Sequence, residues 1–414
     1  MTDLPTVSVI VVSHGRPALL RRALIGIGQL FYRPFELIVV ADPEGLAAIA
    51  DLPFFGRIKT AVQSTPNISA ARNLGVDLAA GSILAFIDDD AVPEPTWLGH
   101  LIFPLLETDF AASTGTVLGR NGISVQWANR VVDALGQAYP MTGAQRPEGC
   151  AIKLEGTNMA VRRDALVQLG GFDEGFGFYL DETDLSRRLN AAGSGVALAP
   201  LATVHHGYAA STRRSADRVP LGLYQIGFST MLFLHKHAGS ARVDDGLNAM
   251  RSEQSARLTR LVTAGKLDGA EAARLMEQLE AGINAGRAAP TERHRHIGKA
   301  PPFCPLHKAP APEPALLVGR WFRGRALTKQ AESMAQQGRS VSLFLLDHTI
   351  RAHRVQVTAA GVWCQSGGLF GPSVRSQPRF TCWSFSGRIR AETERLAKIR
   401  WISGLPAGHI KTLS

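Results

Sequence analysis

The fold of this chain is decided by the stretch Ser82–Asp90, which reads Ser-Ile-Leu-Ala-Phe-Ile-Asp-Asp-Asp. Its first part is a continuous apolar run of strand length, which is typical of a buried strand in a parallel sheet. Three carboxylates then stand at the carboxyl end of the strand, the edge at which open α/β sheets bind ligands. Because carboxylates that lose water need a counter-charge, the stretch indicates either a hard divalent cation or a charged loop after the strand.

Two of these acids suit a shared cation better than the third. Asp88 and Asp90 are two residues apart, so an extended backbone directs both side chains to the same side, whereas Asp89 points elsewhere. A Mg²⁺ or Mn²⁺ ion held by one or two carboxylates would keep open positions for a substrate phosphate. The stretch alone favours neither alternative over the other: it suits a metal site that works together with a phosphorylated ligand and a charged loop about equally.

Strands and helices alternate before this stretch. Three further runs predict buried strands: Val7–Val12, Phe35–Val40 and Arg57–Val62. Helices are predicted to begin at Pro17, which suits a first helical turn, and at Asn67 or Ser69, which suit an N-cap. This order predicts βαβ units, and Asp42, which ends the second strand, is then expected on the same sheet edge as Asp88.

The segments after Asp90 are less regular. Thr96–Leu106 is predicted as a helix and Asn121–Met141 as mostly helical with a loop. Asp181–Leu189 begins with acids and ends with arginines, which suits the dipole of a helix. Val196–Ala199 is predicted as a strand, and the pair His205-His206 follows it.

Composition limits the classes of function. The chain has 414 residues, 45% of them hydrophobic, which is enough for two domains or one large domain with an appendage. Its net charge of +10 favours anionic partners such as nucleotides, nucleic acid or an anionic membrane surface. No nucleic-acid recognition motif accompanies the charge, so we predict no nucleic-acid partner.

The cellular compartment is predicted from three features. Four scattered cysteines form no disulfide framework, which favours a reducing compartment. The N-terminus lacks the basic region and cleavage site of a signal peptide, and the best apolar run, Phe228–Leu234, is too short to span a bilayer. We therefore expect a cytoplasmic protein, either free or peripheral at the inner face of the membrane.

Several motifs, in order, resemble those of glycosyltransferase family 2. The first four are the opening strand with its loop (Val7–Arg16), the acid after the second strand (Val39–Asp42), an Ala-Arg-Asn-x-Gly helix (Ser69–Gly75) and an Asp-x-Asp motif (Phe86–Asp90). Three acceptor-side segments follow: Gly156–Arg162, Gly170–Glu174 and Asp181–Leu189. Each is weak alone, but the ordered set covers about residues 5–235. The resemblance implies an α/β GT-A fold, a Rossmann-like mixed sheet that binds nucleotide-sugars.

The resemblance also implies a reaction and its residues. A sugar would move with inversion from a nucleotide-diphosphate donor to a hydroxyl of a glycan or lipid-linked acceptor, with a divalent metal. The implied nucleotide-sugar contacts are Ser13, Arg16, Asp42, Arg72, Asp88 and Asp89. The implied metal ligands are Asp88 and Asp90, with His205 and His206 as further candidates, although a histidine in a loop more often has no such role.

The catalytic base is where the chain departs from the family. The family usually has Glu-Asp before x-Asp-Leu, with the aspartate as base, whereas this chain has Asp181-Glu182. Glu182 takes the position of the base, and its longer stem shifts the carboxylate by about 1.5 Å; Asp181 is the second candidate. The inverted pair also keeps open a different function, a catalytically degenerate GT-A protein that serves as a glycan- or nucleotide-binding scaffold.

The second half of the chain resembles nothing we recognise. We predict four parts: a GT-A domain, a helical segment, a Pro-rich basic linker and a small α+β domain of unknown role, at residues 1–238, 239–287, 288–314 and 315–414. The loop Gly319–Arg325 is basic and aromatic. It suits a phosphate, an anionic glycan or an acidic lipid headgroup, and a solvated basic surface is the alternative. The oligomeric state does not follow from the sequence.

Overall fold

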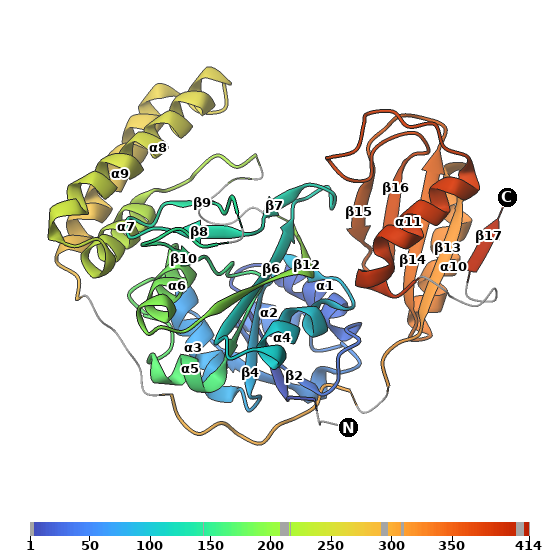
Figure 1. Cartoon of the computed structure of the whole chain (residues 1–414), viewed down its shortest axis with the longest axis horizontal. Coiled ribbons are helices and arrows are strands. Elements are labelled where there is room, and N and C mark those ends of the chain that lie inside the picture. The colour runs from blue at the N-terminus through green and yellow to red at the C-terminus, as the bar shows by residue number, and fades with distance from the viewer. Residues whose placement is uncertain are drawn as a thin grey trace.

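The computed structural model describes residues 4–143, 145–207, 215, 217–290, 297–307, 310–402 and 410–413. These residues form an N-terminal α/β unit, a helical hairpin and a C-terminal α/β unit (Figure 1). The hairpin and the C-terminal unit project from opposite sides of the N-terminal unit.

A mixed sheet forms the centre of the N-terminal unit, with the strand order β3-β2-β1-β4-β11-β6-β12-β5. In that order the strands are Ile58–Val62, Phe35–Ala41, Val7–Val12, Ile83–Asp88, Met159–Arg162, Ala112–Leu118, Val196–His206 and Ala91–Pro93. The first four are parallel, β11 runs antiparallel between β4 and β6, and β5 is antiparallel to β12. The predicted α/β fold with a Rossmann-like mixed sheet is confirmed.

Helices cover this sheet. They are α1 to α6: Pro17–Gly28, Pro43–Ala47, Ile68–Leu78, Trp97–Glu107, Arg163–Gln168 and Asp181–Ala191. Two of them begin where the sequence predicts. Pro17 occupies the first turn of α1, and the side chain of Asn67 caps α3 by accepting a hydrogen bond from the amide of Ala70.

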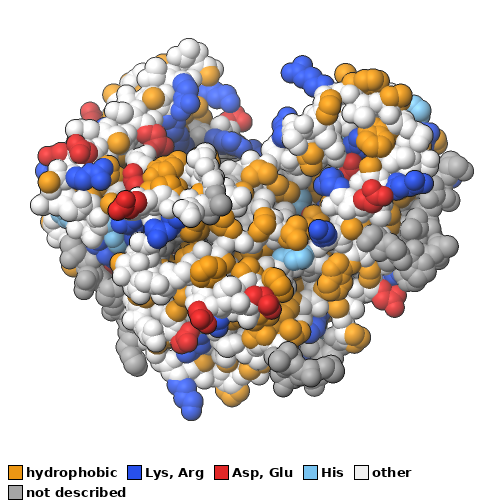
Figure 2. Space-filling view, in the orientation of Figure 1, with side chains coloured by type: hydrophobic (Ala, Val, Ile, Leu, Met, Phe, Trp, Pro, Cys, Tyr) orange, Lys and Arg blue, Asp and Glu red, His pale blue; other side chains and the backbone are white. Residues whose placement is uncertain are grey.

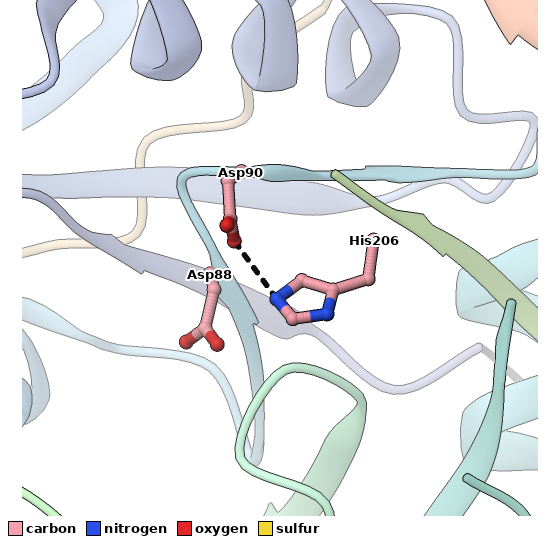
Figure 3. Close-up of side chains that lie close together, drawn as sticks. All are labelled: Asp88, Asp90 and His206. Carbon is pink, nitrogen blue, oxygen red and sulfur yellow. Dashed lines mark ion pairs between the residues drawn. The ribbon is translucent and has the colours of Figure 1, made fainter. Parts of the chain in front are cut away.

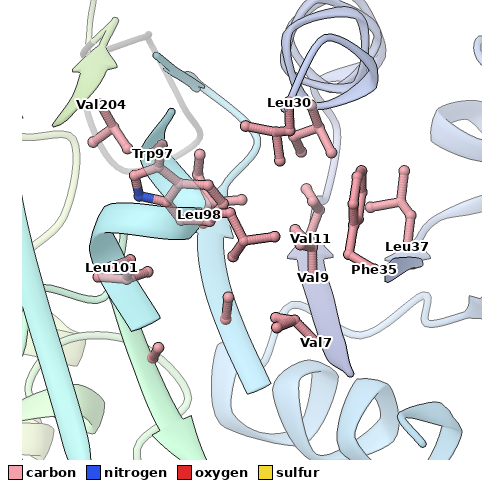
Figure 4. Close-up of a cluster of buried hydrophobic side chains, with 14 of the residues drawn as sticks. Val7, Val9, Val11, Leu30, Phe35, Leu37, Trp97, Leu98, Leu101 and Val204 are labelled. Atoms are coloured by element: carbon pink, nitrogen blue, oxygen red, sulfur yellow. The ribbon is translucent and has the colours of Figure 1, made fainter. Parts of the chain in front are cut away.

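The central strands are buried on both faces, which explains their unbroken apolar sequence. Val7, Val9 and Val11 of β1 lie in one core cluster with Trp97 and with residues of α4 and β2 (Figure 4). The alternate residues of β1 lie in a second cluster with α3. Each fully buried side chain of this size stabilises the fold by roughly 1.5–3 kcal/mol.

The helical prediction for Asn121–Met141 is wrong. The segment forms β7 (Val125–Trp127), β8 (Arg130–Val132) and β9 (Ala138–Pro140). β7 pairs with β6, and β8 lies between β9 and β10 (Ala151–Ile152) in a separate small sheet. The left-handed backbone at Asn129, with φ of 49°, interrupts a helix, and pairing with β6 supplies hydrogen-bond partners that the local sequence does not reveal.

The helical hairpin is formed by α8 (Val243–Thr263) and α9 (Gly269–Arg287). We include in it α7 (Tyr224–His237), the helix that precedes them. α7 packs closely on α9, since a Cβ atom at Gly282 would lie 2.0 Å from the carbonyl oxygen of Tyr224. Among the described residues, every helix is too short or too polar to cross a membrane.

The connection to the C-terminal unit is anchored where it is described. Residues 297–307 run below the N-terminal unit (Figure 1), and Ile297 and Leu306 are buried in its two core clusters. The amide of Cys304 donates to the carboxylate of Glu36 at 3.0 Å. Residues 291–296 and 308–309 of the predicted linker lie outside the described residues.

The C-terminal unit has its own sheet, with the order β15-β16-β14-β13-β17. These strands are Arg354–Val357, Trp363–Gly368, Ser340–Asp347, Pro314–Arg320 and Ile410–Leu413. All except β15 are parallel. A short 3-10 turn, Trp321–Arg323, leads into α10 (Gly324–Gln336), and α11 (Phe385–Arg400) returns toward the N-terminal unit.

Candidate active site

The carboxyl ends of β1, β2 and β4 bring three predicted loops together, because these strands are parallel neighbours. The hydroxyl of Ser13, after β1, donates to Asp89, after β4, at 2.6 Å. Asp42, after β2, accepts hydrogen bonds from the amides of Gly15 and Gly45. Asp42 thus ties the first loop to the start of α2, in addition to the nucleotide contact that the resemblance implies.

Asp88, Asp90 and His206 form the one group of three potential metal ligands found within the described residues. Their ligand atoms all lie within 4.8 Å of one another (Figure 3). Nε2 of His206 is 3.1 Å from Oδ1 of Asp90, which is buried, while the side chain of Asp88 is 27% exposed. Two carboxylates and an imidazole with access from solvent fit Mn²⁺ or Mg²⁺.

A neighbouring amide orients the imidazole of His206. Nδ1 of His206 is 3.1 Å from Oε1 of Gln126 on β7, so the nitrogen is placed to donate to the amide oxygen. That tautomer leaves the lone pair of Nε2 for a cation, which is the usual arrangement of a metal-binding histidine. Sequence reasoning missed Gln126 because its segment was predicted as helical, and no other signal in the sequence identifies it.

Asp89 turns away from this group, as predicted. It is buried and lies 2.6 Å from the guanidinium of Arg16, which also comes within 3.6 Å of Asp90. Burial raises the pKa of Asp89 to about 7, although Arg16 opposes the shift. Asp89 therefore fixes the Ser13–Arg16 loop, and Arg16 places a positive charge beside the metal-binding acids.

Arg72 connects the metal group to the acceptor-side helix. Its guanidinium, on α3, contacts Asp181 and lies 3.3 Å from Asp88. It also donates to the carbonyl oxygen of Gly156 at 3.1 Å. A Cβ atom at Gly156 would lie only 2.8 Å from this guanidinium, so a side chain here would push Arg72 out of its present position.

The two candidate bases have different environments. Glu182 pairs with Nζ of Lys153 at 2.7 Å and its side chain is 19% exposed, whereas that of Asp181 is 4% exposed and faces Arg72. Burial alone would raise the pKa of Glu182, but Lys153 holds it at about 2. Burial raises the pKa of Asp181 to about 7 even though Arg72 opposes it. Lys153 was not identified from the sequence.

The structure separates the two predicted histidines. Both lie within β12, which continues past the strand predicted to end at Ala199, and consecutive residues of a strand point to opposite faces. His205 is therefore not in the metal group; its Nε2 lies 2.7 Å from Glu94.

Glu94 joins this site to the C-terminal unit. Its carboxylate accepts two hydrogen bonds from Arg400 of α11, at 2.7 and 2.8 Å, and both side chains are fully buried. The ring of Trp363 lies 4.5 Å from the guanidinium of Arg400 and 5.0 Å from the ring of His205. Burial would raise the pKa of Glu94, but Arg400 and His205 hold it at about 2. Neither Glu94 nor Arg400 was identified from the sequence.

Buried polar atoms without partners lie on the elements of this site. They are Nε of Arg16, Nε2 of Gln126 and Oγ1 of Thr157, none of which has a hydrogen-bond partner among the described residues. Such unpaired groups are uncommon in folded proteins, and they favour a polar ligand at this edge of the sheet.

Comparison with known proteins identifies the N-terminal unit. Residues 8–170 match the model of glycosyl transferase family 2. The O-antigen biosynthesis protein RfbC of Myxococcus xanthus is 29% identical over 244 residues, 54% of this chain and 19% of that protein. The glucosyl-dolichyl phosphate glucuronosyltransferase of Haloferax volcanii is 28% identical over 159 residues, 35% of this chain and 48% of that protein. The chain thus spans between about a fifth and a half of the length of these relatives.

A solved structure of GalNAc-T7 with UDP, GalNAc and Mn²⁺ is 18% identical, covers 57% of this chain and 48% of its own, and has a TM-score of 0.45. The family match extends from β1 to the turn after α5 and includes Asp88 and Asp90 of the metal group, whereas His206 lies beyond it. The N-terminal unit of this chain is therefore similar to glycosyl transferase family 2 over residues 8–170, and it has the mixed α/β sheet described above.

Proposed function

We propose that this protein transfers a sugar, with inversion, from a nucleoside-diphosphate donor to a hydroxyl group of a glycan or lipid-linked acceptor. The observation that carries the proposal is the group formed by Asp88, Asp90 and His206 at the carboxyl edge of the N-terminal sheet, whose residues 8–170 match family 2. The names of two relatives, an O-antigen biosynthesis protein and a glucosyl-dolichyl phosphate glucuronosyltransferase, support a glycan or a lipid-linked acceptor.

The residues at this edge fit a divalent cation. Asp88, Asp90 and His206 would hold Mg²⁺ or Mn²⁺, and the bound ion would offset the charge that develops on the leaving diphosphate. Arg16 and Arg72, both largely buried beside these acids, would add fixed positive charge on the donor side. Ser13 and Asp89 would hold the loop that carries Arg16.

We assign the general base to Glu182, as its position in the motif predicts. Reach is the first requirement of a base, and Glu182 is the more exposed of the two acids. With a pKa of about 2 it is ionised at neutral pH and can accept the proton of an acceptor hydroxyl. Asp181 would instead orient Arg72 and so hold the donor side of the site.

The molecular surface offers a route for an acceptor. Figure 2 shows a notch between the hairpin and the C-terminal unit, and β7 and β9 lie below it in Figure 1. β7 carries Gln126, which contacts His206.

A thermal-shift screen tests the donor site. The purified chain is melted with UDP, GDP, dTDP and CDP, each with Mn²⁺ or with EDTA, because a ligand that binds only the folded state raises the melting temperature. We expect one nucleotide to raise it only with Mn²⁺, and Asp90→Asn to abolish the shift while the exposed control Asp51→Asn retains it. No shift with any nucleotide contradicts the proposal. A Mn²⁺-dependent shift without transfer to any acceptor would support the scaffold alternative.

A further inference from the structure

The carboxyl edge of the C-terminal sheet carries three loops that the proposed transfer reaction does not use. They lie at the ends of β13, β14 and β16 and comprise residues 319–325, 348–353 and 369–384; the first range includes the last two residues of β13 and the first two of α10. We call them the edge loops. Because β13, β14 and β16 are parallel and adjacent, the edge loops meet at one end of the unit.

Side-chain contacts join the edge loops. The guanidinium of Arg320 contacts His348 and lies 4.6 Å from the ring of Phe385. The ring of His348 is 6.2 Å from that of Phe370, which is 5.9 Å from that of Phe380. The amide of Phe370 also donates to the carbonyl oxygen of Thr349. The three loops are thus one continuous surface.

Large apolar side chains stand exposed on this surface. Trp321 and Phe322 are each 65% exposed, the highest values for large apolar side chains in the described part of the chain. Ile350 and Phe380 are 60% and 58% exposed. Figure 2 shows apolar side chains gathered at the top of the unit on the right, with basic ones beside them. Such a concentration on a soluble protein marks an interaction surface.

The charge of the surface has one sign. Residues 314–331 and 348–384 contain no aspartate or glutamate. The carboxylate at this edge, Asp347, is already engaged by Arg351 and by Thr349. The same segments contain seven arginines: Arg320, Arg323, Arg325, Arg351, Arg354, Arg375 and Arg379. The partner of this surface must therefore be anionic as well as able to accept apolar side chains.

We propose that the edge loops bind a bilayer that contains anionic lipids. The apolar tips Trp321, Phe322, Ile350 and Phe380 would enter the interfacial region, where aromatic side chains are favoured, and the arginines would lie at the headgroups. A nucleic acid would satisfy the arginines, but the aliphatic Ile350 offers no stacking surface to a base.

Vesicle flotation of the full chain tests this surface. We expect the protein to float with vesicles of phosphatidylcholine with 30% phosphatidylglycerol, and to stay behind with phosphatidylcholine alone or in 1 M NaCl, where charges are screened over about 3 Å. The variants W321A/F322A and R323E/R325E should each lower vesicle binding by about tenfold or more. These four side chains are exposed, so both variants should melt as the wild type does.

Matched controls lie outside the edge loops. Phe103→Ala removes an apolar side chain that is 58% exposed on α4, and R242E/K299E reverses two exposed charges. Both should bind vesicles as the wild type does. Equal binding to neutral and anionic vesicles, unchanged binding of both edge-loop variants, or binding to single-stranded nucleic acid or an acidic polysaccharide but not to vesicles would overturn the proposal. Flotation needs no donor, so its failure is distinct from failure of the Mn²⁺-dependent nucleotide shift.

Discussion

The two sheets of this protein end in opposite kinds of surface. The carboxyl edge of the N-terminal sheet holds Asp88, Asp89 and Asp90, largely withdrawn from solvent beside Arg16 and Arg72. The same edge of the C-terminal sheet exposes arginines and aromatic rings and has one engaged carboxylate. Parallel topology creates both edges, but it selects neither ligand. Buried acids need a bound cation or an internal guanidinium, whereas exposed arginines beside apolar tips remain available to an anionic surface.

Glu182→Gln should have the largest effect on the acidic edge. The change removes the proposed base while it retains the size of the side chain, so we expect turnover to fall by about 10²–10⁴-fold with little change in nucleotide affinity. Initial rates and the nucleotide-dependent thermal shift measure the two effects. Turnover close to the wild type would exclude Glu182 as the base.

The pH profile distinguishes the two acids of this pair. An ionised base loses activity as the pH falls through its pKa. With Glu182 as the base, Asp181→Asn should retain turnover at pH 8, and its kcat/KM should fall less steeply below pH 7 than that of the wild type, because the group with a pKa of about 7 is absent. With Asp181 as the base, Asp181→Asn should lose turnover at every pH.

Asp90→Asn should lower Mn²⁺-dependent turnover by about 100-fold. Asp90 is buried against His206, and the neutral amide is a poorer ligand for a hard cation. Initial rates over a Mn²⁺ titration check this expectation, with Asp51→Asn as the exposed control. If the variant retains wild-type turnover and the same Mn²⁺ dependence, Asp90 is not a ligand of the metal.

Arg400→Met should test the connection between the two units that carry these edges. It leaves Glu94 buried beside His205 without its guanidinium partner, which should reduce the free energy of unfolding by about 3–5 kcal/mol. Denaturant unfolding measures the loss. Glu94→Gln in the same chain should recover much of it, since the buried charge is then absent. A single variant as stable as the wild type would show that the two units are joined by other contacts.

Gln126→Leu should have the smallest effect. The amide of Gln126 orients His206 but does not belong to the metal group, so we expect about a tenfold loss of Mn²⁺ affinity without loss of stability. Calorimetric titration measures the affinity, and Gln126→Glu, which keeps the acceptor oxygen, should restore it. Equal Mn²⁺ affinity in the wild type and Gln126→Leu would show that the imidazole needs no second partner.

The parts of this account that the sequence could predict are those encoded by neighbouring residues. The strand that ends in Asp88, the cap at Asn67 and the arginine of α3 all stand in local patterns that match the structure. The orienting and pairing groups do not. Gln126 and His206 are 80 positions apart, and Glu94 and Arg400 are 306 apart, so only the folded chain brings them together.

The misassigned segment shows the same limit. Asn121–Met141 lacks a clear period of either kind, and its strands are short and defined by pairing with each other and with β6 and β10, which lie outside the segment. The strand β12 likewise extends to His206 because β5 and β6 pair with its second half. Because both histidines lie in this strand, His205 and His206 point to opposite faces of the sheet. A loop, as the sequence predicts here, does not impose this alternation.

Calorimetric titration of the full chain with Mn²⁺, in the presence of the nucleotide that gives the thermal shift, tests the central claim most directly. We predict one Mn²⁺ ion bound per chain, and loss of that binding in Asp88→Asn, Asp90→Asn and His206→Ala but not in His205→Ala, since His205 faces Glu94. Saturable Mn²⁺ binding that persists in all three of these variants, or no binding in the wild type, would contradict the assignment of the acidic edge as the metal and donor site.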